Sequence, residues 1–210
     1  MEKTLDENLS IINENEKLIA NILHDIKSPL YSIKIGLQNH LDSELNRDIF
    51  ETTINTINYI EEFLLNYSFK QGKFENKIEK CNIREIINRK IKSYKYILIN
   101  KNIKIDTIYK SEECFVNNIN IFVSSIIGNL ISNIALHAKE NSSARIEIEN
   151  QQKYIQIDFK NYHNSIDNNF SLGLNFCQTL AKCCKIQLKF AKTKTEVKVS
   201  IKIPNINYAD

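Results

Sequence analysis

The sequence has few residues that interrupt regular secondary structure. Its 210 residues include only 4 glycines and 2 prolines, and there is no tryptophan. Because glycine and proline mark most turns and helix ends, their scarcity leaves few composition signals for loops. The length fits one large or two small domains, whose core needs no disulfide or metal to stabilise it.

Neither sign of charge dominates. The chain has 28 Lys+Arg against 25 Asp+Glu, a formal net charge of +3, spread along the sequence rather than gathered into a basic arm. Nucleic-acid binding normally requires such a concentration of positive charge. We therefore expect no nucleic-acid partner.

Targeting and membrane signals are also lacking. The first ten residues, MEKTLDENLS, are acidic and polar, unlike a signal peptide. No stretch stands out as a membrane-spanning segment of roughly 20 apolar residues. We expect a cytoplasmic protein without membrane insertion, and one without a sensor domain of its own if this chain is the whole gene product.

Cysteine spacing gives no sign of a metal site. The five cysteines form no CxxC pair and have no histidine at ligand spacing. An odd number of this kind is typical of a reduced cytosolic chain, in which cysteines act as small buried apolar residues. We assign no redox or zinc role to Cys81, Cys114, Cys177, Cys183 or Cys184.

Residues 1–72 show helical periodicity in two segments separated by a polar break at 42–47. Apolar residues recur there at spacings of three and four, as on amphipathic helices. Two such helices with a short connection predict an antiparallel hairpin. A second copy would cover the narrow apolar stripes, so we expect a homodimer with a four-helix bundle. The stripe residues are Ile12, Ile19, Ile22, Leu23, Ile26, Leu30, Ile33, Leu37 and Leu41, then Phe50, Ile54, Ile57, Ile60, Leu64 and Tyr67.

Residues 73–210 mix helical and strand patterns. Helices segregated against an antiparallel or mixed sheet predict an α+β sandwich as the fold of this second domain. The patterns indicate helices at 83–99, 119–139 and about 172–184, and strands at 102–109, 144–150, 154–159, 186–191 and 196–203.

The middle of the first helix reads HDIKSPL, residues 24 to 30. At about 100° per residue, His24 points roughly 150° away from the apolar stripe and so faces solvent. Neutral imidazole is a good nucleophile near pH 7, and an adjacent carboxylate such as Asp25 can orient one ring proton so that the other nitrogen attacks phosphorus. Pro29 costs the helix about 3 kcal/mol and should loosen it just after His24.

HDIKSPL resembles the phosphoacceptor box of bacterial sensor histidine kinases, in which a His-Asp or His-Glu pair is followed by Lys and Pro-Leu. The resemblance implies that His24 is the phosphoacceptor and Asp25 its acid/base partner, on a dimeric helical hairpin. It also implies a possible phosphatase role for Ser28, where family members carry Thr or Asn. Ser28 matches imperfectly, and a surface serine is the alternative.

Tyr31 and Ile35 share the outward face with His24. An exposed Ile beside a reactive His suggests a docking patch for the receiver domain of a response regulator. A single scattered apolar surface residue is the competing interpretation.

The segment NLISNIALH, residues 129 to 137, is similar to the helix of the kinase ATP-binding domain that presents Asn to Mg²⁺ and Lys to phosphate. Asn129 and Asn133 lie four apart on one face, and Asn133 matches the metal-ligand position. Leu136 stands where the Lys is usual. The resemblance therefore implies that one phosphate contact is missing.

The next family motif, DxGxG, supplies an Asp to the adenine amino group and glycines that let the backbone approach the nucleotide. In this chain Asn161 replaces the Asp, and His163 and Ser165 replace the glycines. The lid that follows in the family is reduced to residues 167–170. Gly173 alone keeps the glycine pattern at the next helix start, where backbone amides can bind an anion.

An intact phosphoacceptor motif beside a degraded nucleotide site predicts a phosphorelay protein. This combination resembles the dimeric histidine phosphotransferases with a degenerate kinase domain, over residues from about 18 to 203. It implies transfer between His24 and a response-regulator aspartate, with no cofactor and with either a receiver-domain aspartate or an upstream kinase as donor. Two alternatives remain open: a divergent sensor histidine kinase that uses Mg-ATP through Asn129, Asn133 and Gly173, and a non-catalytic dimeric adaptor of a signalling partner.

Overall fold

The structure is a computed structural model that describes residues 23, 26, 30–31, 33–36, 44–70, 78–163 and 171–206. The chain divides into two compact units, Met1–Glu75 and Asn76–Asp210.

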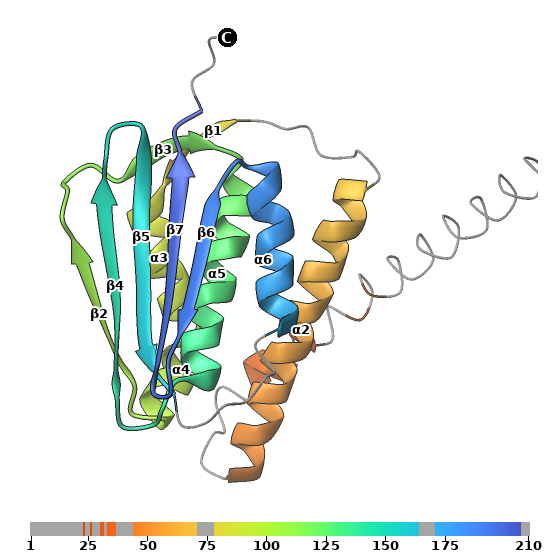
Figure 1. Cartoon of the computed structure of the whole chain (residues 1–210). Helices are drawn as coiled ribbons and strands as arrows, with labels where there is room; N and C mark the ends of the chain where they lie inside the picture. Colours follow the sequence, from red (N-terminus) through yellow and green to blue (C-terminus); the bar gives the residue numbers. More distant parts are fainter. Residues whose placement is uncertain are drawn as a thin grey trace, which may run out of the picture. The chain divides into compact units, whose positions relative to one another are not determined.

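The first unit contains α2, Glu44–Lys70, and the described part of an earlier helix (Figure 1). The apolar period of the second predicted helix is confirmed, because its residues are buried at spacings of three and four. These buried residues are Phe50, Ile54, Ile57, Ile60 and Tyr67. In the earlier helix, the stripe residues Ile26 and Ile33 are 41% and 47% exposed in the single chain.

The second unit is an α+β sandwich with helices on one face of a mixed sheet (Figure 1). Its five-stranded sheet has the order β2-β4-β5-β7-β6, in which β2 and β4 are parallel and the other pairs antiparallel. A separate antiparallel pair is formed by β1 and β3. The elements are β1 Glu79–Asn82, α3 Ile83–Ser93, α4 Lys95–Asn100, β2 Lys104–Tyr109, β3 Phe115–Asn118, α5 Asn120–His137, β4 Ser143–Asn150, β5 Tyr154–Tyr162, α6 Ser171–Cys183, β6 Gln187–Lys192 and β7 Glu196–Pro204.

Alternation of apolar residues explains the sheet. On β5, Ile155, Ile157 and Phe159 are buried while the residues between them are half-exposed. Ile157 pairs with Ile201 of β7, and Phe159 pairs with Val199, so the apolar faces of the two strands coincide. A shift of one residue would turn all of these side chains to solvent, which fixes the register.

Helix α5 is the apolar centre of the helical layer. It packs against α3 and α6, and ten of its 18 residues are buried. Within the described residues it is also the one helix long and apolar enough to cross a membrane by length and composition. The helix was predicted at 119–139, but the expectation that no stretch would be apolar enough to span a membrane does not hold for it by length and composition. Its burial is what a core helix shows.

Two local features differ from the sequence-based expectation. The helix predicted at 83–99 is interrupted at Tyr94, which is buried, and continues as α4. The Ser93 hydroxyl donates to the Lys90 carbonyl oxygen at 2.7 Å just before this break. The short strands β1 and β3 were not predicted at all, because four residues carry too little periodicity to be recognised before their pairing is known.

Candidate functional site

The proposed phosphoacceptor residues lie outside the described residues. This applies to His24, Asp25 and Ser28. Around them, Leu23, Ile26 and Leu30 are helical.

Tyr31 and Ile35, the candidate docking residues, have different surroundings. Ile35 is 59% exposed. Tyr31 is half-buried, and its hydroxyl donates to Oε1 of Glu61 on α2 at 2.8 Å. The Lys34 ammonium lies 5.5 Å from the centre of the Tyr31 ring. Burial lowers the pKa of Lys34, and the nearby Glu61 carboxylate acts in the opposite direction.

Four predicted site residues belong to three elements of the second unit. Asn129 and Asn133 lie on α5, Asn161 lies near the end of β5, and Gly173 is the third residue of α6. Helices α5 and α6 pack against each other. The predicted short lid at 167–170 and Ser165 lie outside the described residues.

The two asparagines of α5 contact each other directly. The Asn133 side-chain amide donates to Oδ1 of Asn129 at 3.4 Å, and both residues are half-buried. The distance is long, so this hydrogen bond is weak. The pair is therefore held one turn apart on a single helix face, as the sequence spacing predicts.

A lysine does reach the end of this helix, but from another element. Leu136 is half-buried, and its carbonyl oxygen accepts a hydrogen bond from Nζ of Lys101 at 3.0 Å. A cation at a helix C-terminus satisfies a free carbonyl and the helix dipole. Lys101 thus has a structural partner at this position.

Asn161 and His163 point into the domain. Both are only 5% exposed. The Asn161 side-chain amide donates to the carbonyl oxygen of Tyr162 at 3.2 Å. Nε2 of His163 lies 3.1 Å from the carbonyl oxygen of Thr193, and the His163 backbone N–H donates to Thr195. The imidazole is therefore packed and hydrogen-bonded where the family resemblance places a glycine.

The cysteine thiols are mostly buried. All five are free, four are buried and Cys183 is half-buried. Burial raises the pKa of the Cys81 thiol to about 11 and that of Cys184 to about 12. In the part of the chain that the structure describes, no group of three His, Cys, Asp or Glu side chains could hold a metal ion.

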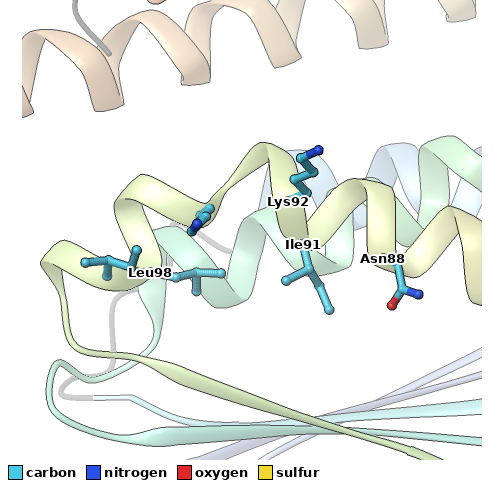
Figure 2. A pocket seen from close by; sticks show the side chains of 6 residues that line it. Asn88, Ile91, Lys92 and Leu98 are labelled. Atoms are coloured by element: carbon cyan, nitrogen blue, oxygen red, sulfur yellow. The ribbon is translucent and has the colours of Figure 1, made fainter. Parts of the chain in front are cut away.

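A surface on α3 and α4 was not singled out from the sequence. The structure places an apolar pocket there beside several cationic side chains (Figure 2). The sequence feature that could have indicated this cationic surface is the run of arginines and lysines between residues 84 and 95.

Comparisons with known proteins identify the fold. No protein-family model and no curated protein matches the sequence. Among solved structures, Acinetobacter baumannii histidine kinase AdeS matches with a TM-score of 0.62 and 14% identity, over 88% of this chain and 98% of that chain. The catalytic domain of histidine kinase ThkA matches with a TM-score of 0.55 and 16% identity, over 61% of this chain and 97% of that chain.

A third match is ThkA in complex with response regulator protein TrrA, with a TM-score of 0.58 and 17% identity, over 98% of this chain and 65% of that chain. At such identities the likeness establishes the fold alone. The second unit therefore has the α+β fold with a mixed sheet that is found in histidine-kinase catalytic domains.

Proposed function

We propose that this chain is a two-component phosphorelay protein, in which His24 exchanges a phosphoryl group with a response-regulator aspartate and ATP binds weakly or not at all. The proposal joins the HDIKSPL motif of the first unit to the histidine-kinase catalytic fold of the second. The observation that carries it is the burial of His163 at a position where nucleotide binding in the family calls for glycine.

The side chains of the second unit do not suit Mg-ATP. Phosphoryl transfer from ATP depends on cations and backbone donors that neutralise the phosphates. Here Leu136 replaces the phosphate-binding lysine, and nearby Lys101 is hydrogen-bonded to the end of α5. The Asn161 side-chain amide donates to the carbonyl oxygen of Tyr162, and Nε2 of His163 lies 3.1 Å from the carbonyl oxygen of Thr193. The proposed transfer therefore does not use a nucleotide.

The transfer itself uses the first unit. A ring nitrogen of neutral His24 attacks the phosphorus of a regulator's aspartyl phosphate; the N–P bond forms as the P–O bond to the aspartate breaks. The aspartate leaves as a carboxylate, and the proton on the other ring nitrogen is oriented by Asp25. The reverse transfer follows the same geometry. Tyr31 and Ile35 would contact the receiver domain.

A homodimer is part of this proposal. Ile26 and Ile33 repeat at a spacing of seven and remain 41% and 47% exposed in the single chain. A second hairpin would remove these side chains from water and complete a four-helix bundle. Light scattering at two protein concentrations measures the mass, and Ile26→Asp with Ile33→Asp should yield the monomer.

The experiment that tests the transfer uses two phosphoryl sources. The chain is incubated with receiver domains carrying labelled aspartyl phosphate and, separately, with labelled Mg-ATP. We expect acid-labile, alkali-stable label from the receiver domains only. His24→Ala should abolish it, whereas His40→Ala, which removes another histidine of the first unit, should not. Binding of partners without any labelling would instead indicate the adaptor.

An active sensor kinase is the second candidate. The Asn129 and Asn133 pair on one face of α5 favours it, because this is the arrangement that the resemblance links to Mg²⁺. Labelling of His24 from Mg-ATP, lost in Asn133→Ala and kept in the exposed-site control Asn100→Ala, would establish this reading and overturn the relay.

A further inference from the structure

Helices α3 and α4 carry an apolar pocket on the second unit. Its volume is about 300 Å³. Figure 2 shows Asn88 and Ile91 directed toward the strands and Lys92 directed away from the strands, so that Lys92 lines the other edge of the same pocket. The lining residues are Asn88, Ile91, Lys92, Lys95, Leu98 and Ile99.

A second depression continues this pocket along α3. Its volume is about 510 Å³, and it shares Asn88 and Lys92 with the first. Its other lining residues are Asn82, Arg84, Glu85 and Arg89. We call the two together the α3–α4 groove. One end of the groove is apolar and the other is cationic.

The charge on these helices is one-sided. Residues 83–100 contain five cationic side chains, Arg84, Arg89, Lys90, Lys92 and Lys95, against one acidic side chain, Glu85. Lys92 and Lys95 are exposed and form no ion pair with any acidic group in the described ranges. The exposed ammonium groups of Lys92 and Lys95 therefore favour an anionic partner.

The two arginines are held in place by their neighbours. The Arg84 guanidinium lies 3.9 Å from the centre of the Tyr109 ring, and the Tyr109 hydroxyl donates to Oδ1 of Asn88 at 3.3 Å. Nη2 of Arg89 lies 3.4 Å from the Ser124 hydroxyl. Cations that are already oriented lose less side-chain entropy when a carboxylate binds.

The apolar end of the groove is unusually open to solvent. Ile99 is 62% exposed, more than any other large apolar side chain among the described residues, and Tyr96 on the same short helix is 43% exposed. An apolar pocket rimmed by charge is the usual anatomy of a protein-docking site. The charge on the rim then decides which partner fits.

We propose that the α3–α4 groove binds an acidic protein segment that inserts one large apolar side chain beside Ile91, Leu98 and Ile99. The carboxylates that flank this side chain face Arg84, Arg89, Lys92 and Lys95. The partner is identified by charge complementarity. The site lies wholly within the second unit and does not involve His24, so it stands apart from the proposed phosphoryl transfer.

The probe is a fluorescein-labelled peptide with one Phe flanked on both sides by Glu. Two matched peptides carry Lys in place of Glu, or Ser in place of Phe. By fluorescence anisotropy at low salt, we expect the Glu/Phe peptide to bind about tenfold more tightly than either matched peptide, because apolar anchor and charge both contribute. Raising the salt concentration should weaken binding further. Equal binding of the three peptides overturns the proposal.

Variants locate the site. Lys92→Glu with Lys95→Glu should lower the affinity about tenfold, and Ile99→Ser should lower it severalfold. Lys189→Glu with Lys198→Glu makes the same charge change on exposed positions of β6 and β7 and should have no comparable effect. Circular dichroism verifies that each variant folds. His24→Ala should bind the peptide like the wild type, which separates this test from that of the relay.

Three results would contradict the proposal. The first is an equal loss of binding in the Lys189 and Lys198 variant and in the groove variant, which would mean that net charge alone attracts the peptide. The second is a set of peptide-induced amide chemical-shift changes that lie outside α3 and α4. The third is dissociation of a dimer of the free protein by Ile99→Ser, measured by light scattering, which would make the groove an interface with a second copy.

Discussion

The phenolic oxygen of Tyr31 lies 2.8 Å from Oε1 of Glu61, and the two residues are 30 positions apart in the chain. The contact joins the earlier helix of the first unit to α2 and restricts how one can slide along the other. Helical periodicity placed Tyr31 on the outward face with His24. Its long side chain nevertheless reaches α2, because a tyrosine can place its apolar ring on one surface and its hydroxyl on another.

Removing the Tyr31 hydroxyl should destabilise the first unit. We expect Tyr31→Phe to lower the free energy of unfolding by about 1–2 kcal/mol, because a hydrogen bond to a charged acceptor is lost. Urea denaturation measures this free energy of unfolding. Tyr59→Phe is the matched control, since Tyr59 is 56% exposed on α2. Equal effects of the two substitutions would show that the Tyr31 contact contributes nothing.

Replacement of His163 should separate stability from nucleotide binding. His163→Gly removes a buried ring and its hydrogen bond to Thr193, and should cost about 2–4 kcal/mol of stability. Alone it should not permit ATP binding, because Leu136 still occupies the lysine position. His163→Gly combined with Leu136→Lys should give weak ATP binding by calorimetry. Tight ATP binding by the wild type would contradict the proposal that this chain binds ATP weakly or not at all.

Asn118 is completely buried and connects separate elements of the second unit. Its amide donates to the Pro204 carbonyl oxygen at 3.0 Å, and its Oδ1 accepts the Ile119 N–H at 2.8 Å. Asn118→Ala leaves both groups unpaired and should cost about 2–4 kcal/mol. Asn100→Ala, at an exposed position on α4, should change stability by less than about 0.5 kcal/mol. Chemical denaturation distinguishes the two.

The buried thiols should make the protein less stable in alkali. Thiols ionise near 9.0 in the unfolded chain, but burial raises the pKa to about 11 for Cys81 and about 12 for Cys184. Their contribution to stability is complete below about pH 9 and is lost as the pH rises through the folded-state values, because only the unfolded state ionises in that window.

Urea midpoints between pH 8 and 10.5 measure this loss. In Cys81→Ala with Cys184→Ala, the midpoint should fall less steeply with pH than in the wild type. Tyr109, whose pKa is also raised by burial, is present in both proteins and cancels from the comparison. Identical slopes would show that these thiols do not control the alkaline behaviour.

Periodicity predicted the main elements of the second unit because buried apolar residues and exposed polar residues recur at regular spacings along them. The helix predicted at 119–139 is α5, and the strands predicted at 144–150 and 154–159 are β4 and β5. These segments are long, and their apolar residues face one core. The interruption at Tyr94 left no such trace, since Ile91, Ile97 and Leu98 keep the apolar character of a continuous helix.

The candidate site residues show the same distinction between features that local spacing predicts and features that depend on distant contacts. The spacing of Asn129 and Asn133 was sufficient to place them on one helix face, because helical geometry relates positions four apart. The partners of His163 and Asn118 lie 30 and 86 residues away and depend on how strands are brought together. Local patterns contain no information about such distant contacts.

The sequence by itself determined the periodic elements, the α+β class of the second unit and the motif around His24, because each depends on residues close together in the chain. Only the tertiary structure decided the parallel pairing of β2 with β4, the Tyr31 to Glu61 contact and the apolar groove beside the cations of α3 and α4. These features arise when distant segments pack, and packing energy depends on surfaces that no short stretch of sequence defines.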